Sequence, residues 1–230
     1  MESANPQIRG SSDSRVRLIV FDLDGTLVDS RRDLAESANA ILVECGARPL
    51  PEAEIGRFVG DGAATLVART FSAAGCPQPA DALSRFLAVY NSRLLLCTQA
   101  YPGIPAVLAS LAARAILAVL TNKPLGPTRE ILEGLGLAAH FATERVLGGD
   151  GPFQRKPDPA GLGHLCAQAG VSPSQAVLVG DSLIDWRTAR AAGTRICLAG
   201  YGFGFEGFPT SVLSEDDPVV AVPAELLRVL

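Results

Sequence analysis

RLIVFDLDGTL, residues 17–27, is the stretch that decides the fold. Its first five residues, 17–21, are mainly β-branched or aromatic, which predicts a strand buried on both faces. Asp22 and Asp24 follow two residues apart, so both side chains project from one face, and Gly25 lets the chain turn away after them. In an open α/β sheet, ligands bind beyond the carboxyl ends of the strands. We therefore expect a parallel α/β sheet with two carboxylates at its ligand-binding edge.

The rest of the chain divides into an all-helical block and an alternating block. Residues 29–99 show helical periodicity and turn signals but no strand pattern, whereas strand and helix patterns alternate from residue 100 onward. Such alternation is typical of a parallel sheet covered by helices on both faces. We predict a Rossmann-like α/β core of residues 17–28 and 100–230, an all-helical cap of residues 29–99 inserted into it, and a flexible leader, residues 1–16. In the alternative, the 29–99 helices pack directly on the sheet in one globule.

The same periodicities place the individual elements. We expect helices over residues 30–46, 63–74, 80–97, 104–113, 127–135, 160–169 and 186–192. We expect strands over residues 17–21, 115–120, 145–147, 176–179 and 194–198. Residues 210–222 give no usable pattern.

The composition excludes several other classes of protein. The 230 residues carry a net charge of −4 without a basic run longer than Arg31-Arg32, so nothing indicates nucleic-acid binding. Apolar stretches such as residues 115–120 are too short to span a bilayer, and the polar N-terminus has no apolar signal segment. The five cysteines form no C-x-x-C pair and predict reduced thiols in a cytoplasmic protein. No pattern indicates the oligomeric state.

Three more polar clusters stand at the ends of later strands or before a later helix. They are Thr121-Asn122-Lys123, Lys156 before Pro157, and the pair Asp181 and Asp185 in GDSLID, residues 180–185. Each alone is explained by a helix cap, a solvated charge or a turn, but their order along successive strand ends predicts one shared site. The chain has only two lysines, Lys123 and Lys156, and both belong to these clusters. Close carboxylates at one edge favour a shared hard divalent cation with oxygen ligands.

These motifs resemble those of a known family. D-L-D-G-T, T-N-K, the lysine before Pro157 and G-D-S-x-x-D are similar to the four motifs of the haloacid dehalogenase-like hydrolase superfamily. The resemblance runs from about residue 17 to 209 and includes a helical insertion directly after the first motif. DLDGTLVDS followed by DLA, FVGDGA in the insertion and YPGI at its exit resemble the bacterial phosphoglycolate phosphatases in particular.

The resemblance implies a phosphoric monoester hydrolase with a defined set of site residues. Asp22 is then the nucleophile that forms an aspartyl phosphate, Asp24 the general acid and base, and Lys156 a third catalytic group. Mg²⁺ is the implied cofactor, with Asp22, Asp24, Asp181 and Asp185 as its site. The implied substrate or phosphate contacts are Thr121, Asn122, Lys123, Gly25, Thr26 and Arg57.

The resemblance also implies a small phosphorylated metabolite as substrate, most closely 2-phosphoglycolate, with neither a nucleic acid nor a membrane as partner. Its carboxylate needs a cationic or amide contact, for which Arg57, Arg69 and the amides of residues 60–62 are candidates. Asp61 is unexpected beside an anionic substrate. The alternatives are a broader sugar-phosphate or pyrophosphate phosphatase, a β-phosphoglucomutase-like mutase and a non-catalytic binding module. Such mutases usually carry a histidine where this chain has Leu34.

Overall fold

The computed structural model describes residues 15–230. All but the last two residues of the predicted leader, residues 1–16, therefore lie outside the described part of the chain. Val16 is already buried, and the backbone N–H of Arg17 donates to the carbonyl of Gln175 at 2.8 Å. Among the described residues, burial thus begins at Val16.

Six parallel strands form the central sheet. In spatial order these are β5 (Val146–Leu147), β4 (Ile116–Leu120), β1 (Leu18–Phe21), β6 (Ala176–Gly180), β7 (Arg195–Ala199) and β8 (Val219–Val220). Strand β1 lies between β4 and β6, with Phe21 in register with Val119 on one side and Val179 on the other. The chain therefore leaves β1 toward one half of the sheet and later returns to build the other half, which places a topological switch point at the end of β1.

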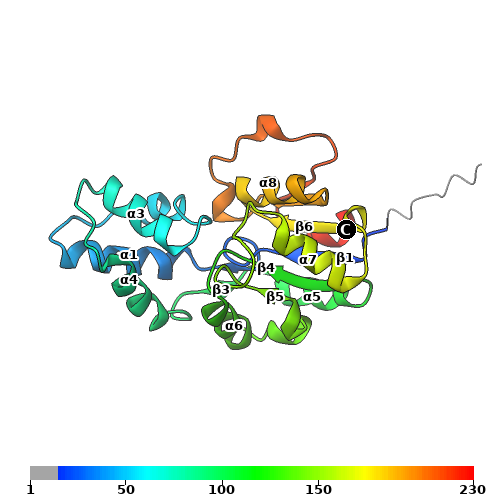
Figure 1. Cartoon of the computed structure of the whole chain (residues 1–230), viewed down its shortest axis with the longest axis horizontal. Helices are drawn as coiled ribbons and strands as arrows, with labels where there is room; N and C mark the ends of the chain where they lie inside the picture. Colours follow the sequence, from blue (N-terminus) through cyan, green and yellow to red (C-terminus); the bar gives the residue numbers. More distant parts are fainter. Residues whose placement is uncertain (1–14) are drawn as a thin grey trace, which may run out of the picture.

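Helices cover both faces of this sheet, as Figure 1 shows. Helices α5 (Ile104–Ala112), α6 (Leu125–Gly134) and α9 (Leu226–Val229) pack on one face, and α7 (Ala160–Ala169) and α8 (Leu183–Ala192) pack on the other. Ile19 and Phe21 of β1 point into the first layer, whereas Leu18 and Val20 point into the second. The two-sided burial explains the uninterrupted apolar run of β1 and confirms the predicted α/β fold class.

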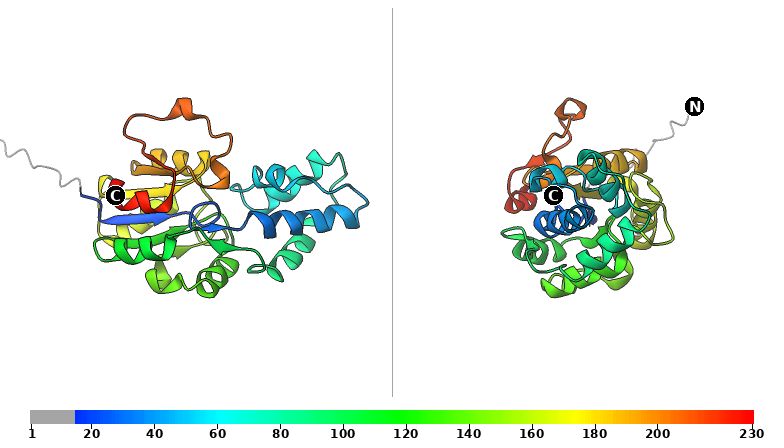
Figure 2. Two further views of the ribbon diagram at one scale, coloured as in Figure 1. Left: turned by 180° about the vertical axis from the view of Figure 1, so that it is seen from behind. Right: turned by 90° about the vertical axis from the view of Figure 1, so that its left-hand side faces the viewer.

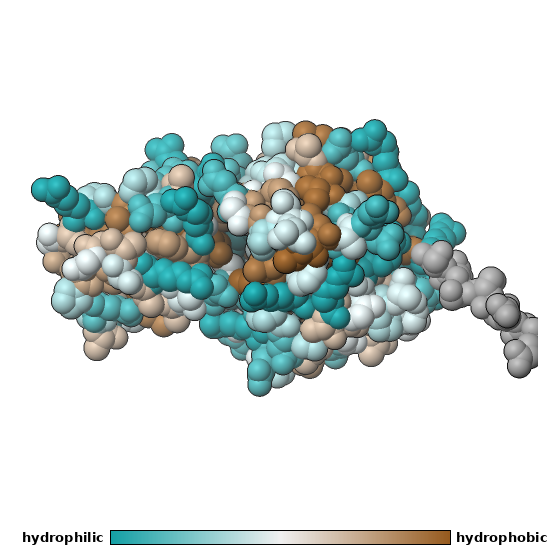
Figure 3. Space-filling model, turned by 90° about the horizontal axis from the view of Figure 1, so that it is seen from above, coloured by the Kyte–Doolittle hydropathy of each residue, from teal (hydrophilic) through white to brown (hydrophobic). Residues whose placement is uncertain are grey.

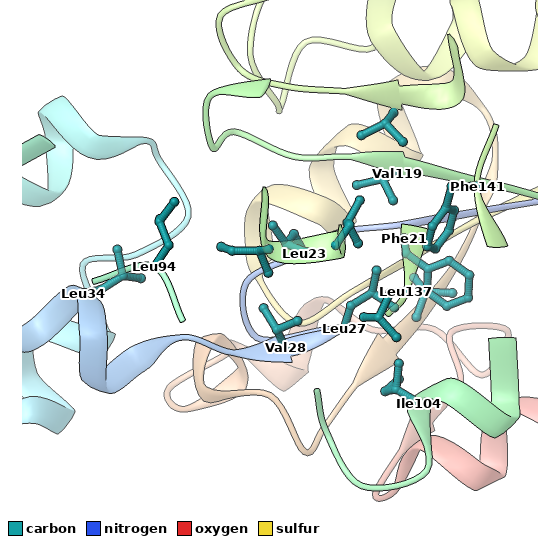
Figure 4. Close-up of a cluster of buried hydrophobic side chains, with 14 of the residues drawn as sticks. Phe21, Leu23, Leu27, Val28, Leu34, Leu94, Ile104, Val119, Leu137 and Phe141 are labelled. Atoms are coloured by element: carbon teal, nitrogen blue, oxygen red, sulfur yellow. The ribbon is translucent and has the colours of Figure 1, made fainter. Parts of the chain in front are cut away.

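Figure 4 shows the centre of the first apolar layer. Phe21 and Phe141 meet edge to face with ring centroids 6.4 Å apart, and Leu27 and Leu137 lie beside them. Leu27 is fully buried although it follows the turn after β1. This packing fixes the loop that carries Asp22 and Asp24 against the sheet.

The remaining helices lie together beyond the carboxyl end of the sheet, at one end of the molecule (Figure 2). They are α1 (Arg31–Glu44), α2 (Glu52–Gly56), α3 (Ala63–Ala73) and α4 (Ala82–Asn91). The chain enters and leaves this helical region through a short antiparallel ribbon in which β2 (Val28–Asp29) pairs with β3 (Gln99–Ala100). Only these two crossings join the helical region to the sheet along the chain.

Some element boundaries differ from those expected. The helix expected over 80–97 ends at Asn91, and turns follow over residues 92–96 before the N–H groups of Cys97 and Thr98 donate to the Asp33 carboxylate. Strand β8 lies within the segment that gave no pattern, and α2 was not predicted either. Two-residue strands and a five-residue helix are too short to show a period.

The surface on the α8 side includes a hydrophobic area over the larger part of the molecule (Figure 3). Exposed large apolar side chains include Val212, Val219 and Val222 in the C-terminal segment. Within residues 15–230, none of the helices has both the length and the apolar character needed to cross a membrane.

Candidate active site

The predicted polar clusters converge at the carboxyl edge of the three central strands. Asp22 follows β1, Thr121 follows β4 and Asp181 follows β6, and all three side chains are at most 5% exposed. They line one pocket, whose opposite wall comes from the helical region. The parallel register of β4, β1 and β6 is what brings these distant positions together.

Lys156 lies among the buried carboxylates of this edge. Its Nζ is 2.9 Å from Oδ1 of Asp22 and 2.6 Å from Oδ1 of Asp185. Asn122 fixes the backbone of Lys156 on both sides, because its Oδ1 accepts from the Lys156 N–H at 2.8 Å and its Nδ2 donates to the Lys156 carbonyl at 2.9 Å. The motif after β4 thus positions the lysine that the motif before α7 supplies.

A second ion pair holds Asp24. Lys123 Nζ lies 3.0 Å from Oδ1 and 2.9 Å from Oδ2 of this carboxylate, and the Ser30 hydroxyl donates to Oδ1 at 2.5 Å. Lys123 also lies over the ring of Tyr90 in α4, with Nζ 4.6 Å from the ring centroid. Asp24 is therefore held by both the sheet and the start of the helical region.

Asp22, Asp181 and Asp185 form a candidate metal centre. One carboxylate oxygen from each can be chosen so that all three lie within 4.8 Å of one another, and all three residues are buried. Together with Asp24 these are four carboxylates facing only two ammonium groups, those of Lys123 and Lys156. The excess of two negative charges and the all-oxygen donor set fit one hard divalent cation.

Glycines enclose Asp181 closely. A Cβ added at Gly25 would lie 1.8 Å from Asp181 Oδ2, and one at Gly204 would lie 2.6 Å from the same atom. At Gly202, an added Cβ would lie 2.4 Å from Asp181 Cβ. The Gly204 N–H donates to Asp181 Oδ2 at 2.7 Å, which fixes one carboxylate oxygen. Gly25 also has a φ of 83°, a conformation that favours glycine.

The N-terminus of α8 orients Asp185. Ser182 and Asp185 form a reciprocal capping box, in which the Ser182 N–H and hydroxyl donate to Asp185 Oδ2 at 3.1 and 2.6 Å. The other carboxylate oxygen, Oδ1, is the one that accepts from Lys156. Gly180 leaves room for this arrangement, because an added Cβ there would lie 2.2 Å from Asp185 Cγ.

Burial dominates the electrostatics of the site. It raises the pKa of Asp22 to about 6, against the neighbouring Lys156 ammonium, which lowers it. Burial also raises the pKa of Asp181 well above its usual range, and the Asp185 and Asp22 carboxylates raise it further. For Lys156, burial lowers the pKa, but the Asp185 and Asp22 carboxylates outweigh it and hold the pKa above its ordinary value. These carboxylates therefore lack enough positive charge to ionise easily without a cation.

The helical region contributes a mostly apolar wall to the pocket. Its lining residues are Leu34, Val59, Gly60, Gly62, Ala63, Leu66, Phe86, Leu87 and Tyr90. Asn122 Nδ2 donates to the carbonyl of Gly60 at 2.8 Å, so the site residues contact this wall directly. Among these residues only Tyr90 offers a polar side-chain group.

Four of the predicted substrate or phosphate contacts lie elsewhere or act differently. Arg57 is exposed at the end of α2 and is not part of the pocket lining. Arg69 pairs with Asp61 at 2.6 Å, so Asp61 has a partner within the helical region. Thr26 is fully buried, and Gly25 faces Asp181 instead of the pocket. The structure therefore gives no contact that supports a substrate role for these side chains.

Sequence reasoning missed four residues that contribute to the site. Tyr90 carries only the periodicity of a helix core residue, and Ser30 is only the first residue of an expected helix. Gly202 and Gly204 lie in a glycine- and aromatic-rich segment to which no role is assigned from sequence. Their closeness to Asp181 depends on the loop after β7 folding back over the sheet edge. A glycine repeat next to a strand end was the one available signal.

Comparison with known proteins agrees with this geometry. Residues 19–199 match the family model described as haloacid dehalogenase-like hydrolase. A phosphoglycolate phosphatase from Rhodospirillum rubrum is 47% identical over 199 residues, covering 83% of this chain and 82% of the relative. The plasmid phosphoglycolate phosphatase of Cupriavidus necator is 37% identical over 217 residues, covering 90% and 92%. A crystal structure described as a predicted phosphoglycolate phosphatase from Haemophilus somnus has a TM-score of 0.85 and 31% identity, covering 93% of this chain and 97% of that one.

Proposed function

The chain belongs to the haloacid dehalogenase-like hydrolases, and on that basis we propose that it is a Mg²⁺-dependent phosphatase that hydrolyses 2-phosphoglycolate to glycolate. The observation that carries this proposal is the 2.9 Å pairing of Lys156 with buried Asp22, which lines the same pocket as Thr121 and Asn122. A carboxylate beside an ammonium, a hydroxyl and an amide suits attack on a phosphoryl group, whose charge must be neutralised as it transfers.

In the first step, Asp22 attacks phosphorus. A bond forms between an Asp22 carboxylate oxygen and phosphorus, and the bond from phosphorus to the ester oxygen breaks. Asp24 gives a proton to that leaving oxygen, so glycolate is released and an aspartyl phosphate remains. Lys123 and Ser30 support this role by holding the Asp24 carboxylate at the edge of the same pocket.

In the second step, water attacks phosphorus of the aspartyl phosphate. Asp24 takes a proton from the water, the bond between Asp22 and phosphorus breaks, and inorganic phosphate leaves. Lys156 and the Thr121 hydroxyl interact with the equatorial oxygens in both steps. The Asn122 amide has its own role, since it fixes the Lys156 backbone.

The metal site that fits these residues consists of Asp22, Asp181 and Asp185, with the backbone carbonyl of Asp24 as a further oxygen donor. When bound there, Mg²⁺ supplies charge neutralisation for the nucleophile and the transferring phosphoryl group. Asp185 is already engaged by Lys156 and Ser182, so it orients the site more than it ligates directly.

The choice of 2-phosphoglycolate over larger sugar phosphates rests on two supports. The relatives from Rhodospirillum rubrum and Cupriavidus necator carry that substrate in their names. The wall from the helical region is also nearly free of polar side chains, whereas a sugar with several hydroxyl groups needs several hydrogen-bond partners. The broader sugar-phosphate or pyrophosphate phosphatase remains the second candidate because its chemistry at Asp22 is the same.

We assign residues 29–99 the role of a cap that closes over the substrate. The ribbon of β2 and β3 supports this role, because both crossings lie side by side and leave the helical region hinged at one place. Closure would exclude bulk water from the aspartyl phosphate until hydrolysis. The cytoplasmic location predicted from the sequence stays a prediction.

Phosphate release tests the proposal. The purified protein is assayed with 2-phosphoglycolate, a panel of sugar phosphates and pyrophosphate, with Mg²⁺ or with EDTA, beside Asp22→Asn. We expect kcat/KM to be highest for 2-phosphoglycolate, and activity to be lost with EDTA and in the variant. Turnover spread evenly over the panel would replace the substrate assignment by the broader phosphatase. Absence of metal-dependent turnover of every compound would contradict the enzymatic function.

A further inference from the structure

The Tyr90 hydroxyl is a buried polar group without a partner. Tyr90 is 3% exposed, and its Oη makes no hydrogen bond to any residue in the described part of the chain. Lys123 is the one group close enough to interact with this hydroxyl among the described residues, and that contact falls outside ordinary hydrogen-bond geometry. A buried, unpaired hydroxyl costs free energy, typically 1–3 kcal/mol. Such a group at a pocket wall therefore points to a partner that arrives with the ligand.

Its place in the pocket defines what that partner is. Lys123 connects Tyr90 to Asp24, the group assigned to the leaving oxygen, so the Tyr90–Lys123 pair lies next to the carbon chain of the leaving alcohol. In 2-phosphoglycolate, the carboxylate is joined to that oxygen through a single methylene. An ammonium has three donors, and the contact with Asp24 leaves Lys123 free to donate to a second carboxylate.

Among side chains, the rest of the wall offers no other partner for a substrate carboxylate, and the backbone amides of residues 60–62 are its remaining candidates. Tyr90 is the only polar side chain that the helical region adds to the pocket, whose other lining side chains from this region include Leu34, Leu66 and Phe86. Neither Arg57 nor Arg69 lines the pocket. An anion buried against this wall needs charge and hydrogen bonds to offset its desolvation.

From this arrangement we infer that Tyr90 is a specificity-determining residue, whose hydroxyl donates a hydrogen bond to the substrate carboxylate while Lys123 pairs with its charge. The inference rests on the proposed function. It adds the residue that selects a phosphate ester with a carboxylate on its leaving group over one with a neutral leaving group. Burial raises the pKa of Tyr90 to about 12, so the hydroxyl is a donor at neutral pH. Helix α4 thereby contributes directly to substrate choice.

The first test compares two esters that differ only at the carboxylate. Tyr90→Phe removes one hydroxyl and keeps the ring that stacks on Phe86 at 5.7 Å. In 2-hydroxyethyl phosphate a hydroxymethyl group replaces the carboxylate. We expect Tyr90→Phe to lower kcat/KM for 2-phosphoglycolate roughly ten- to a hundredfold, mainly through KM, as for one lost hydrogen bond to a charged group. The kcat/KM for 2-hydroxyethyl phosphate should change by less than about threefold, because this ester has no carboxylate for the Tyr90 hydroxyl to bond.

Controls separate this role from a structural one. Ser84→Ala removes an exposed hydroxyl from the same helix and should leave both esters unaffected. Tyr90→Phe should melt close to the wild type, because the lost hydroxyl makes no hydrogen bond of ordinary geometry to the described residues. Equal losses for the two esters, or no loss for 2-phosphoglycolate, would overturn the inference.

A binding measurement keeps this test independent of turnover. In the Asp22→Asn background, calorimetry should show that Tyr90→Phe weakens the binding of 2-phosphoglycolate by the same factor. The affinity for inorganic phosphate should not change. If the wild type hydrolyses neither ester, the proposed function fails, and this binding comparison still decides the role of Tyr90. Unchanged affinity for 2-phosphoglycolate would refute that role.

Discussion

At the scale of single residues, the acidic site depends on how completely its carboxylates are removed from water. Gly25, Gly202 and Gly204 leave no room for side chains around Asp181, so the loop after β7 closes directly on it. Asp22 is 5% exposed and shares Lys156 with Asp185. Burial raises the pKa values of Asp22 and Asp181, and the neighbouring carboxylates, which one ammonium does not neutralise, raise them further.

The raised pKa of Asp22 predicts how stability depends on pH without metal. The folded state holds a proton on Asp22 up to about pH 6, whereas an aspartate with its ordinary pKa loses it near pH 3.8. Stability from this group is therefore present below pH 3.8 and lost as pH rises through 6. We expect metal-free Asp22→Asn to be more stable than the wild type at pH 8, by on the order of 2–3 kcal/mol, and the difference to shrink toward pH 4.

Urea unfolding between pH 5 and pH 8 measures this difference, with EDTA and with saturating Mg²⁺. Mg²⁺ should stabilise the wild type more at pH 8 than at pH 5, because it competes with the bound protons. Asp216→Asn removes an exposed carboxylate and is the matched control. We expect its free energy of unfolding to depend on pH as that of the wild type does. If the metal-free wild type is as stable as Asp22→Asn at pH 8, burial does not raise the pKa of the Asp22 carboxyl as we expect.

At the scale of elements, α1 holds the two chain crossings together. Asp33 in its first turn is fully buried, and its Oδ2 accepts from the N–H groups of Cys97 and Thr98 at 2.8 and 2.7 Å and from the Thr98 hydroxyl at 2.8 Å. These bonds join the start of the helical region to its end, directly beside the β2–β3 ribbon. The geometry of the hinge thus depends on one carboxylate.

Loss of this carboxylate should destabilise the protein. Asp33→Ala leaves two buried N–H groups unpaired, and we expect the free energy of unfolding to fall by about 3 kcal/mol. Amide exchange at Cys97 and Thr98 should accelerate with it. Arg32→Ala removes an exposed side chain one residue earlier, which pairs with Glu36, and should leave the free energy of unfolding close to that of the wild type. If Asp33→Ala unfolds with nearly the wild-type free energy, the hydrogen bonds of Asp33 do not hold the two ends of the helical region together.

Long, periodic elements were predictable from sequence because one local signal decides them. The apolar run of β1 and the strands β4, β6 and β7 alternate with helices, and this pattern fixed the sheet class without tertiary information. The ribbon of β2 and β3 and strand β8 were not predictable, since two-residue strands exist only through their partners. The motifs also placed Asp22 and Lys156 at one edge, whereas the approach of Tyr90 to Lys123 needed the packing of α4 against α1.

At the scale of the whole molecule, the site lies between two parts that contribute different chemistry. The sheet edge supplies every charged group of the pocket, and the helical region supplies an apolar wall with one hydroxyl. The two parts meet where Asn122 bonds to the Gly60 carbonyl and where Lys123 lies over Tyr90. In the proposed mechanism these contacts open for substrate entry, and the described arrangement is the closed form that keeps bulk water from the aspartyl phosphate.

The central claim is that Asp22 accepts the phosphoryl group, and rapid acid quench followed by peptide mass spectrometry tests it most directly. The enzyme is mixed with 2-phosphoglycolate and Mg²⁺ and quenched within one turnover, beside Asp24→Asn and Asp22→Asn. We expect one phosphoryl group on the peptide that contains Asp22, more of it in Asp24→Asn if hydrolysis slows more than formation, and none in Asp22→Asn. Phosphate release by the wild type with a phosphoryl group on another residue, or on none at any quench time, would contradict the account.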